Sequence, residues 1–455
     1  MFTSKFYVNS PIFLQNIIVS LVYLIRKILR DNSKTRAYKK ELYENEYSIE
    51  KSTEYTQRKL KQTLKNAVEN SEFYRNNPDI DPDNLDGFPY ISKKDLLANP
   101  KAFTAEKKPF PSFNVSTSGT TGSPLVVATP LETLVLEEAF ISRMREWAGF
   151  EKGDRRAWIR ADQVVPAGQT KAPYWRTSWF DDMLIMSSYH ITEEALPLYL
   201  EKLMDFDPAI ISIYPSTITV FARYLESQGK YYKGNLKAIL TSSESFAVED
   251  KALVEERFGS RVVEWYSMVE RASAITNCEH GNYHVVSDYA YTEFLDAGDG
   301  RHEIVGTSFN NPLFPVIRYR TGDYLVLKED QSCPCGRVYP VVDRVHGRIG
   351  DYLIGENGQK VHVLNTVPKG VLGVLACQFI QDRLGYVEAM VVANKSVFDD
   401  AQEQKLIHNI RLHLGHSMEV GVTLVETLPK TRNGKVRQAV CSIKDVPQPE
   451  IETVE

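Results

Sequence analysis

The region between residues 157 and 240 most constrains the fold of this chain, because short apolar runs alternate there with longer amphipathic segments. The runs at residues 209–214 and 236–240 have the length of buried strands, and the segments between the runs have helical spacing. This alternation predicts an α/β layered fold with a largely parallel sheet. Ligands of such sheets bind at the carboxyl ends of the strands. Polar residues follow three of the predicted strands, at residues 214–216, 241–244 and 266–270.

Residues 116–124, with the sequence Ser-Thr-Ser-Gly-Thr-Thr-Gly-Ser-Pro, form a predicted turn between two short strands. Glycines allow close approach of the backbone, and hydroxyl and N–H groups donate hydrogen bonds to anions such as phosphate. A Walker loop requires a lysine after its second glycine, where this chain has Ser123. The segment therefore predicts an anion site of another kind, with a flexible Ser/Thr/Gly loop as the alternative.

The composition is that of an ordinary globular protein with room for two or more domains, since 455 residues include 43% hydrophobic and 25% charged residues. A net charge of -5 and the lack of a long basic run argue against a general nucleic-acid binder. Five unevenly spaced cysteines are too few for a disulfide framework. They predict a reducing, cytoplasmic location.

An apolar stretch near the start, residues 11–27, predicts an amphipathic helix packed on the body of the protein. Gln15, Asn16 and Ser20 interrupt it, and its apolar part is shorter than the roughly 20 residues of a membrane span. No small-residue cleavage site follows it. A weak contact with a membrane surface is the first alternative, and a span or a signal is the second.

The pattern of predicted elements changes after Gly347 and Gly350, and these two glycines are predicted to form a joint between two domains. Strands at residues 386–393 and 422–426 flank a helix at residues 401–414 and predict a small α+β unit of about a hundred residues. The predicted fold is α/β, with a large multi-sheet N-terminal domain at residues 1–347 and a small mobile C-terminal domain at residues 348–455. More antiparallel strands are expected near residues 293–309, and a strand with a turn at residues 317–324.

Five motifs occur in order along residues 90–440: the loop at residues 116–124, Tyr266 to Glu270, Y-R-T-G-D at residues 319–323, Gly347-Arg348, and Pro-Lys-Thr-Arg-Asn-Gly-Lys-Val-Arg at residues 429–437. Together they resemble the adenylate-forming superfamily of acyl-CoA synthetases, peptide-synthetase adenylation domains and luciferases, which has Y-G-x-T-E as its second motif and P-K-T-x-x-G-K-x-x-R as its last. Cys-Pro-Cys-Gly-Arg before the joint and the Thr-Ser-Ser-Glu turn resemble the phenylacetate–coenzyme A ligase group, and its CapK-like branch associated with capsular polysaccharide synthesis.

The resemblance implies two half-reactions: a carboxylate attacks the α-phosphorus of ATP to form acyl-AMP, and a nucleophile then takes the acyl group. It implies that Lys435 bridges the carboxylate and the α-phosphate, where negative charge builds in the transition state. Glu270 would bind Mg²⁺. The loop would hold the β- and γ-phosphates through Ser116, Thr117, Ser118, Gly119, Thr120, Thr121 and Gly122.

The same resemblance implies contacts to the nucleoside. Asp323 would accept from the ribose hydroxyls, with Arg348 as a second ribose or phosphate contact. The remaining nucleotide contacts implied are Tyr266, Ser267, Ser243 and Glu244. Departures from the family pattern occur at Ser267 and Val269, where Gly and Thr are usual, and at Gly350, where Asp or Lys is usual.

Cys278, His284, Cys333 and Cys335 form a separate set that fits a tetrahedral structural Zn²⁺ site, as in some members of the phenylacetate ligase group. His280 is the less favoured histidine. The alternative is that reduced cysteines are simply buried near a loop.

The predicted function is that of an AMP-forming carboxylate ligase that uses ATP and Mg²⁺ and passes the acyl group from acyl-AMP to coenzyme A. One alternative acceptor is an amine of a sugar or amino acid, in surface polysaccharide synthesis. Another alternative is a non-catalytic nucleotide-binding scaffold. The acid itself is not identified, although Arg160, near a predicted strand end, would favour a second carboxylate or a phosphate on the substrate. Other residues near such ends are Trp158, His190 and Tyr214.

Overall fold

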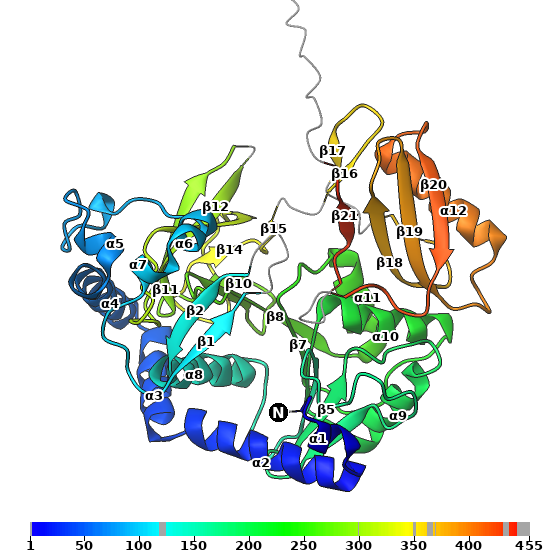
Figure 1. Ribbon diagram of the computed structural model, residues 1–455, viewed down its shortest axis with the longest axis horizontal. Helices are drawn as coiled ribbons and strands as arrows, with labels where there is room; N and C mark the ends of the chain where they lie inside the picture. The colour runs from blue at the N-terminus through cyan, green and yellow to red at the C-terminus, as the bar shows by residue number, and fades with distance from the viewer. Residues whose placement is uncertain are drawn as a thin grey trace, which may run out of the picture.

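The computed structural model describes residues 2–117, 124–298, 300–348, 352–361, 367–368, 370–430 and 436–443, with Gly347, Arg348 and Lys360 described by their backbone alone. A large body formed by the blue to yellow part of the chain carries a smaller unit, drawn in orange, on one side (Figure 1). This arrangement confirms the predicted α/β class with a large and a small part. The boundary at residue 347 stays a prediction.

A nine-stranded sheet forms the centre of the large body, in the order β14-β10-β9-β8-β7-β6-β3-β5-β4. Pairing is parallel from β8 through β7, β6 and β3 to β5, as the alternation of strands and helices predicts. The outer strands β4, β9, β10 and β14 pair antiparallel. The strands are β3 (Arg156–Arg160), β4 (Trp175–Ser178), β5 (Met183–Ser187), β6 (Ile210–Ile213), β7 (Ala238–Ser242), β8 (Arg261–Ser267), β9 (Ala274–Asn277), β10 (Tyr283–Val285) and β14 (Val341–Val342).

Helices cover this sheet because the parallel strands are apolar on both faces. One buried cluster joins β3, β5 and β6 to α9, α10 and α11, and a second joins the sheet to α8. The sequence predicts a helix at residues 131–147, after the glycine-rich segment, and this helix is α8. The helices are α8 (Leu131–Trp147), α9 (Leu196–Phe206), α10 (Pro215–Ser227) and α11 (Val248–Phe258).

A four-stranded sheet, in the order β11-β12-β13-β15, and the hairpin β1-β2 complete the large body. The predicted strand and turn at residues 317–324 correspond to β13, in which residues 321–323 form a bulge in the pairing with β12 rather than a turn that ends the strand. Gly322 adopts a φ of 70°, which glycine tolerates and which lets the strand continue. The strands are β1 (Ser112–Ser116), β2 (Val126–Pro130), β11 (Ala290–Asp296), β12 (Arg301–Ser308), β13 (Tyr319–Val326) and β15 (Gly347–Arg348).

The N-terminal helices wrap the body, and α2 covers the edge strand β4, at the bottom of Figure 1. Polar residues within the apolar stretch of α2 accept hydrogen bonds from the backbone at this edge. Asn16 Oδ1 accepts from Thr177 N at 3.1 Å, and Ser20 Oγ accepts from Trp179 N at 3.0 Å. The helices are α1 (Lys5–Asn9), α2 (Ile12–Arg30), α3 (Ser33–Glu46), α4 (Ile49–Asn70), α5 (Glu72–Arg75), α6 (Lys93–Ala98), α7 (Pro100–Phe103) and the 3-10 helix η1 (Leu85–Gly87).

The predicted helix at residues 11–27 is thus packed on the body, as expected. Its outer face, with Phe13, Leu21, Ile25 and Ile28, is exposed. Among the described helices, α2 alone is long and apolar enough to cross a membrane by length and composition. A contact between this face and a membrane surface stays a prediction.

The small unit is a four-stranded sheet in the order β20-β19-β18-β21, backed by α12. Its predicted strand at residues 386–393 is β19, whereas β20 begins earlier than predicted and ends at Leu424. Leu375, Val392 and Leu428 pack into the core of the large body near α10. The elements are β16 (Leu353–Ile354), β17 (Lys360–Val361), β18 (Val374–Gln381), β19 (Tyr386–Ala393), α12 (Asp400–Leu414), β20 (Glu419–Leu424) and β21 (Ala439–Cys441).

Candidate active site and metal centre

The base of the Ser/Thr/Gly loop is a two-stranded hairpin, as predicted. Ser116 at the end of β1 is in register with Val126 of β2, and Leu125 N donates to Thr117 Oγ1 at 2.9 Å. The Thr117 hydroxyl therefore closes the base of the loop. The other predicted phosphate contacts, Ser118, Gly119, Thr120, Thr121 and Gly122, lie outside the described residues.

Two motif residues that are 57 positions apart meet at the carboxyl end of β8. Tyr266 Oη donates to Asp323 Oδ2 at 2.9 Å, and Asp323 comes from β13 in a different sheet. Asp323 is largely buried, and its backbone N–H donates to Thr321 Oγ1 at 3.0 Å. Arg348 is its backbone neighbour, because Asp323 and Arg348 are in register across β13 and β15. The structure thus brings together three of the predicted nucleoside contacts.

Glu270, the predicted magnesium ligand, lies just beyond the same strand end. Its carboxylate is buried, and Oε1 accepts from Tyr319 Oη at 3.1 Å. Tyr319 also belongs to β13, so β8 and β13 together position both carboxylates of the predicted site. A carboxylate oxygen is the ligand that a hard cation such as Mg²⁺ prefers. Glu270 therefore fits this role by its donor type.

A buried network that sequence analysis missed fixes the chain between Tyr266 and Glu270. Ser267 Oγ lies 3.1 Å from Tyr289 Oη, and Tyr289 donates to Glu137 Oε2 at 2.9 Å. Arg271 Nε donates to the same Glu137 oxygen at 3.1 Å. The hydroxyl at position 267, where the family has glycine, thus has a partner inside the protein. No sequence motif connects these residues, because they come from α8, β8 and the segments after β8 and β10.

Ser243 and Glu244, predicted near the adenine, follow β7. Ser243 has a φ of 74°, a left-handed conformation that is uncommon for serine and recurs at functional sites. Glu244 Oε2 accepts from Ser216 N at 3.0 Å, at the start of α10. A carboxylate is favourable there, since the first N–H groups of a helix lack helical partners. Both residues therefore lie at the carboxyl edge of the central sheet, as the alternation predicts.

The small unit meets this edge through Lys430, in the last of the five motifs. Lys430 Nζ donates to the carbonyl oxygen of Ser188, just after β5, and lies 5.9 Å from the centroid of the Tyr189 ring. Burial lowers the pKa of Lys430 to about 8, and the charge of Glu244 opposes this shift. Lys435, the predicted catalytic lysine, lies outside the described residues, between Lys430 and Val436, which form an antiparallel bridge.

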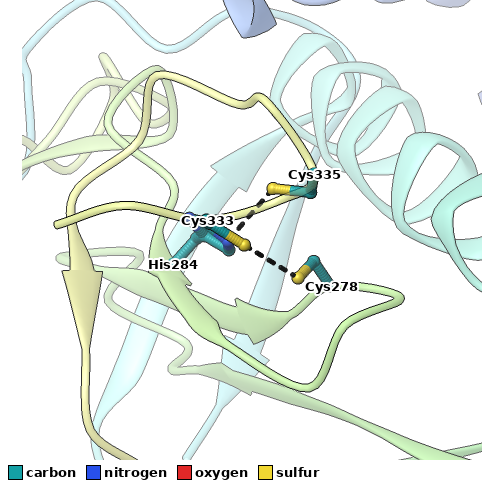
Figure 2. Close-up of side chains that lie close together, drawn as sticks. All are labelled: Cys278, His284, Cys333 and Cys335. Atoms are coloured by element: carbon teal, nitrogen blue, oxygen red, sulfur yellow. Dashed lines mark hydrogen bonds between the residues drawn. The ribbon is translucent and has the colours of Figure 1, made fainter. Parts of the chain in front are cut away.

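The four residues of the predicted zinc site converge, as Figure 2 shows. Cys278 follows β9, His284 is on β10, and Cys333 and Cys335 precede β14. The Sγ atoms of Cys278 and Cys333 are 3.6 Å apart, and Cys335 Sγ lies 3.4 Å from His284 Nε2. Tetrahedral ligands about 2.0–2.3 Å from a zinc ion lie about 3.5–3.8 Å from one another. The geometry therefore fits a closed tetrahedral site, with His284 as the histidine.

Protonation states at this centre follow from its surroundings. His284 Nδ1 lies 3.1 Å from the Tyr339 carbonyl and donates to it, which leaves the Nε2 lone pair directed at the sulfur atoms. Burial lowers the pKa of His284 and thus favours the neutral imidazole. Burial also raises the pKa of the Cys278 thiol to about 12, whereas hydrogen bonds from the Cys335 backbone and side chain outweigh burial and lower the pKa of Cys333.

Comparisons with known proteins find relatives over most of the chain. The CapK C-terminal domain family matches residues 353–441. Protein CapK of Staphylococcus aureus is 25% identical over 449 residues, which cover 96% of this chain and 99% of that protein. The phenylacetate-coenzyme A ligase of Aromatoleum evansii is 26% identical over 419 residues, which cover 84% of this chain and 92% of that enzyme.

A solved structure shares the fold over most of the chain. It is that of 2-hydroxyisobutyryl-CoA ligase in the postadenylation state, in complex with R3-HIB-AMP. The TM-score is 0.64 at 18% identity, and the match covers 87% of this chain and 91% of that chain. At this identity the likeness shows the fold alone.

Proposed function

We propose that this chain, which belongs to the adenylate-forming superfamily and there to the CapK-like branch of the phenylacetate–coenzyme A ligase group, is an ATP-dependent, AMP-forming acid ligase. The contact of Tyr266 with Asp323, at 2.9 Å, is the observation that carries the proposal. It joins two motifs from different sheets at one strand end. A hydrogen bond from Tyr319, which belongs to the same strand as Asp323, holds the Glu270 carboxylate near this strand end.

Each residue of the site has a defined task in the proposed reaction. Asp323 accepts from the ribose hydroxyls, and its bond to Tyr266 fixes the ring of that tyrosine beside the nucleotide. Glu270 would supply a carboxylate oxygen to Mg²⁺, whose charge would neutralise phosphate oxygens. Lys435 bridges the acid and the α-phosphate, so that its ammonium offsets the charge that develops as pyrophosphate leaves.

Coenzyme A is the proposed acceptor in the second half-reaction. Relatives named as phenylacetate-coenzyme A ligases support it. An amine on a sugar or amino acid stays the alternative acceptor. In either case the acyl carbon of acyl-AMP bonds to the nucleophile, and AMP leaves with the bonding electron pair.

Exchange of labelled pyrophosphate into ATP, measured over a panel of organic acids, tests the proposed function. At least one acid is expected to support exchange that requires Mg²⁺. Formation of AMP that then depends on coenzyme A, rather than on an added amine, identifies the acceptor. Failure of every acid in a broad panel would contradict the ligase proposal and favour a nucleotide-binding scaffold.

We also propose a structural Zn²⁺ ion at Cys278, His284, Cys333 and Cys335, because the donor set and its distances fit one. Purified protein is expected to contain about one zinc ion per chain, and Cys333→Ser to lose most of it. Elemental analysis checks both. Cys377→Ser is the matched control, since this free cysteine lies in β18 of the small unit. Protein that is purified without chelators and lacks metal would end the zinc proposal.

A further inference from the structure

A cluster of charged groups lies at the carboxyl ends of β3, β5, β6 and β7, apart from the residues used in the proposed chemistry. Arg160, the last residue of β3, donates from Nη2 to the oxygen atoms of Ser242 at the end of β7. Its guanidinium carbon lies 4.9 Å from the centroid of the Tyr214 ring and 5.3 Å from that of Trp158. Arg160 Nε is shielded from solvent and has no acceptor among the described residues.

A second cation reaches the same place from the small unit. Lys430 donates from Nζ to the Ser188 carbonyl, and Ser188 Oγ donates to the Arg160 carbonyl at 3.0 Å. One serine therefore contacts both basic residues. The lowered pKa of Lys430 reflects the cost of a buried ammonium, which a bound anion would reduce.

The charges of this cluster do not balance. Glu244 is the carboxylate whose charge acts on both Arg160 and Lys430. Asp162, the other carboxylate near Arg160, lies 3.6 Å from Arg26 and accepts from Trp158 Nε1 at 2.6 Å. No ion pair joins Arg160 or Lys430 to a carboxylate in the part of the chain that the structure describes.

Two poorly hydrated cations that share one carboxylate leave a net positive charge. Such a charge is costly to keep without a counterion. The planar guanidinium presents paired donors that match a carboxylate or a phosphate, and its aromatic neighbours hold it in place. The cluster is therefore suited to an anion that arrives with a ligand.

We propose that Arg160 and Lys430 bind a second anionic group of the acid substrate, a carboxylate or a phosphate, so that this enzyme activates dianionic acids. The inference rests on the proposed function, because it assigns the acid to the carboxyl edge of the central sheet. The reacting carboxylate would then lie toward the end of β8, which Glu270 follows, and the second anion toward the end of β3.

Matched pairs of acids test this assignment in the pyrophosphate exchange assay. Each dicarboxylic acid, from malonate to adipate and including an aromatic diacid, is compared with its own half-amide, which has the same shape but lacks the second charge. Each is also compared with the phosphono analogue, which separates carboxylate from phosphate recognition. For the best pair, kcat/KM is expected to be about 100-fold higher for the dianion, since a charged contact of this kind contributes about two powers of ten.

Variants of the basic residues test whether this cluster causes the preference for dianionic acids. Arg160→Met is expected to lower kcat/KM for the dianion about 100-fold and that for the half-amide less than about 3-fold, with Arg160→Lys intermediate. Arg155→Met, at an exposed arginine just before β3, is the matched control and is expected to change neither. Lys395→Met is the matched control for Lys430→Met, because Lys395 is an exposed lysine of the same small unit.

The outcomes separate this inference from the proposed function. If no acid supports exchange, the ligase proposal fails first. If acids are activated but half-amides equal or exceed the dianions with the unmodified protein, the inference is overturned and the ligase proposal stands. If Arg160→Met instead raises KM for ATP or coenzyme A and leaves the preference between acids unchanged, the cluster binds nucleotide phosphates and the inference is again overturned.

Discussion

Replacement of Lys435 by alanine is expected to lower the rate of acyl-AMP formation by about 10²–10³-fold or more, because it removes the cation that offsets charge on the α-phosphate. Transfer of the acyl group from acyl-AMP supplied in solution is expected to remain largely intact. We expect the small domain that carries Lys435 to rotate after adenylation, so that this lysine does not contact the AMP group that leaves in the second half-reaction. Pyrophosphate exchange reports the first step, and thioester or amide formation from synthetic acyl-AMP reports the second.

The structure places both ends of the segment that carries Lys435. Lys430 and Val436 form a bridge, and Lys430 contacts Ser188 at the carboxyl edge of the central sheet. The motif therefore begins at the same carboxyl edge of the sheet as Tyr266 and Glu270, at the end of β5 rather than of β8. Lys395→Ala is the control, since it removes an exposed lysine from the same small unit. Equal loss of both half-reactions in Lys435→Ala would count against a role confined to adenylation.

The sequence allowed much of the fold to be predicted, because local patterns specify it. The alternation at residues 157–240 predicts the parallel centre of the sheet, and α8 and β19 have the predicted bounds. The strand predicted within residues 317–324 is β13, but the bulge at residues 321–323 in its pairing with β12 was not predicted. Register and pairing depend on a distant strand, which no local pattern reveals.

The candidate site was likewise predictable only in part: its motif residues could be predicted, and the contacts between them could not. Motifs predict roles for Glu270 and Asp323, but they do not indicate that Tyr319 donates to the first or that Tyr266 donates to the second. Lys430 lies within a motif, yet its contact with Ser188 depends on how the small unit packs against α10. Single side chains from distant segments make these contacts, so the sequence alone gives no signal for them.

Arg143 on α8 illustrates such a contact, and it connects the core to the metal centre. Its guanidinium is fully buried and donates to both carboxylate oxygens of Asp288, at 2.8 and 2.9 Å, and to Tyr339 Oη at 2.7 Å. Tyr339 Oη in turn donates to Asp288, and the Tyr339 carbonyl accepts from His284. Arg337, two residues before Tyr339, pairs with the buried Glu46 at 2.6 Å. The loop that carries Cys333 and Cys335 is thus tied to α3 and α8.

Arg143→Met is expected to lower the free energy of unfolding of the large body by about 3–5 kcal/mol, because it leaves the Asp288 carboxylate buried without its cation. Arg145→Met, two residues along the same helix, removes a more exposed pair with Glu138 and is expected to cost less than about 1 kcal/mol. Urea unfolding followed by tryptophan fluorescence measures both, since all five tryptophans precede residue 266 and Trp147 lies beside Arg143. Equal midpoints for the two variants would contradict the assigned contribution.

A second readout distinguishes this network from ordinary core packing. Because Tyr339 links Arg143 to His284, Arg143→Met is also expected to weaken zinc binding by about 10–100-fold, as loss of outer contacts to a metal ligand commonly does. Competition with a chelator measures this, with Arg145→Met again as the control. The double variant Arg143→Met/Asp288→Leu removes both charges and is expected to recover part of the stability, since no unpaired carboxylate remains at position 288. It would not recover the zinc affinity, because the Tyr339 hydroxyl would have lost both Arg143 and Asp288.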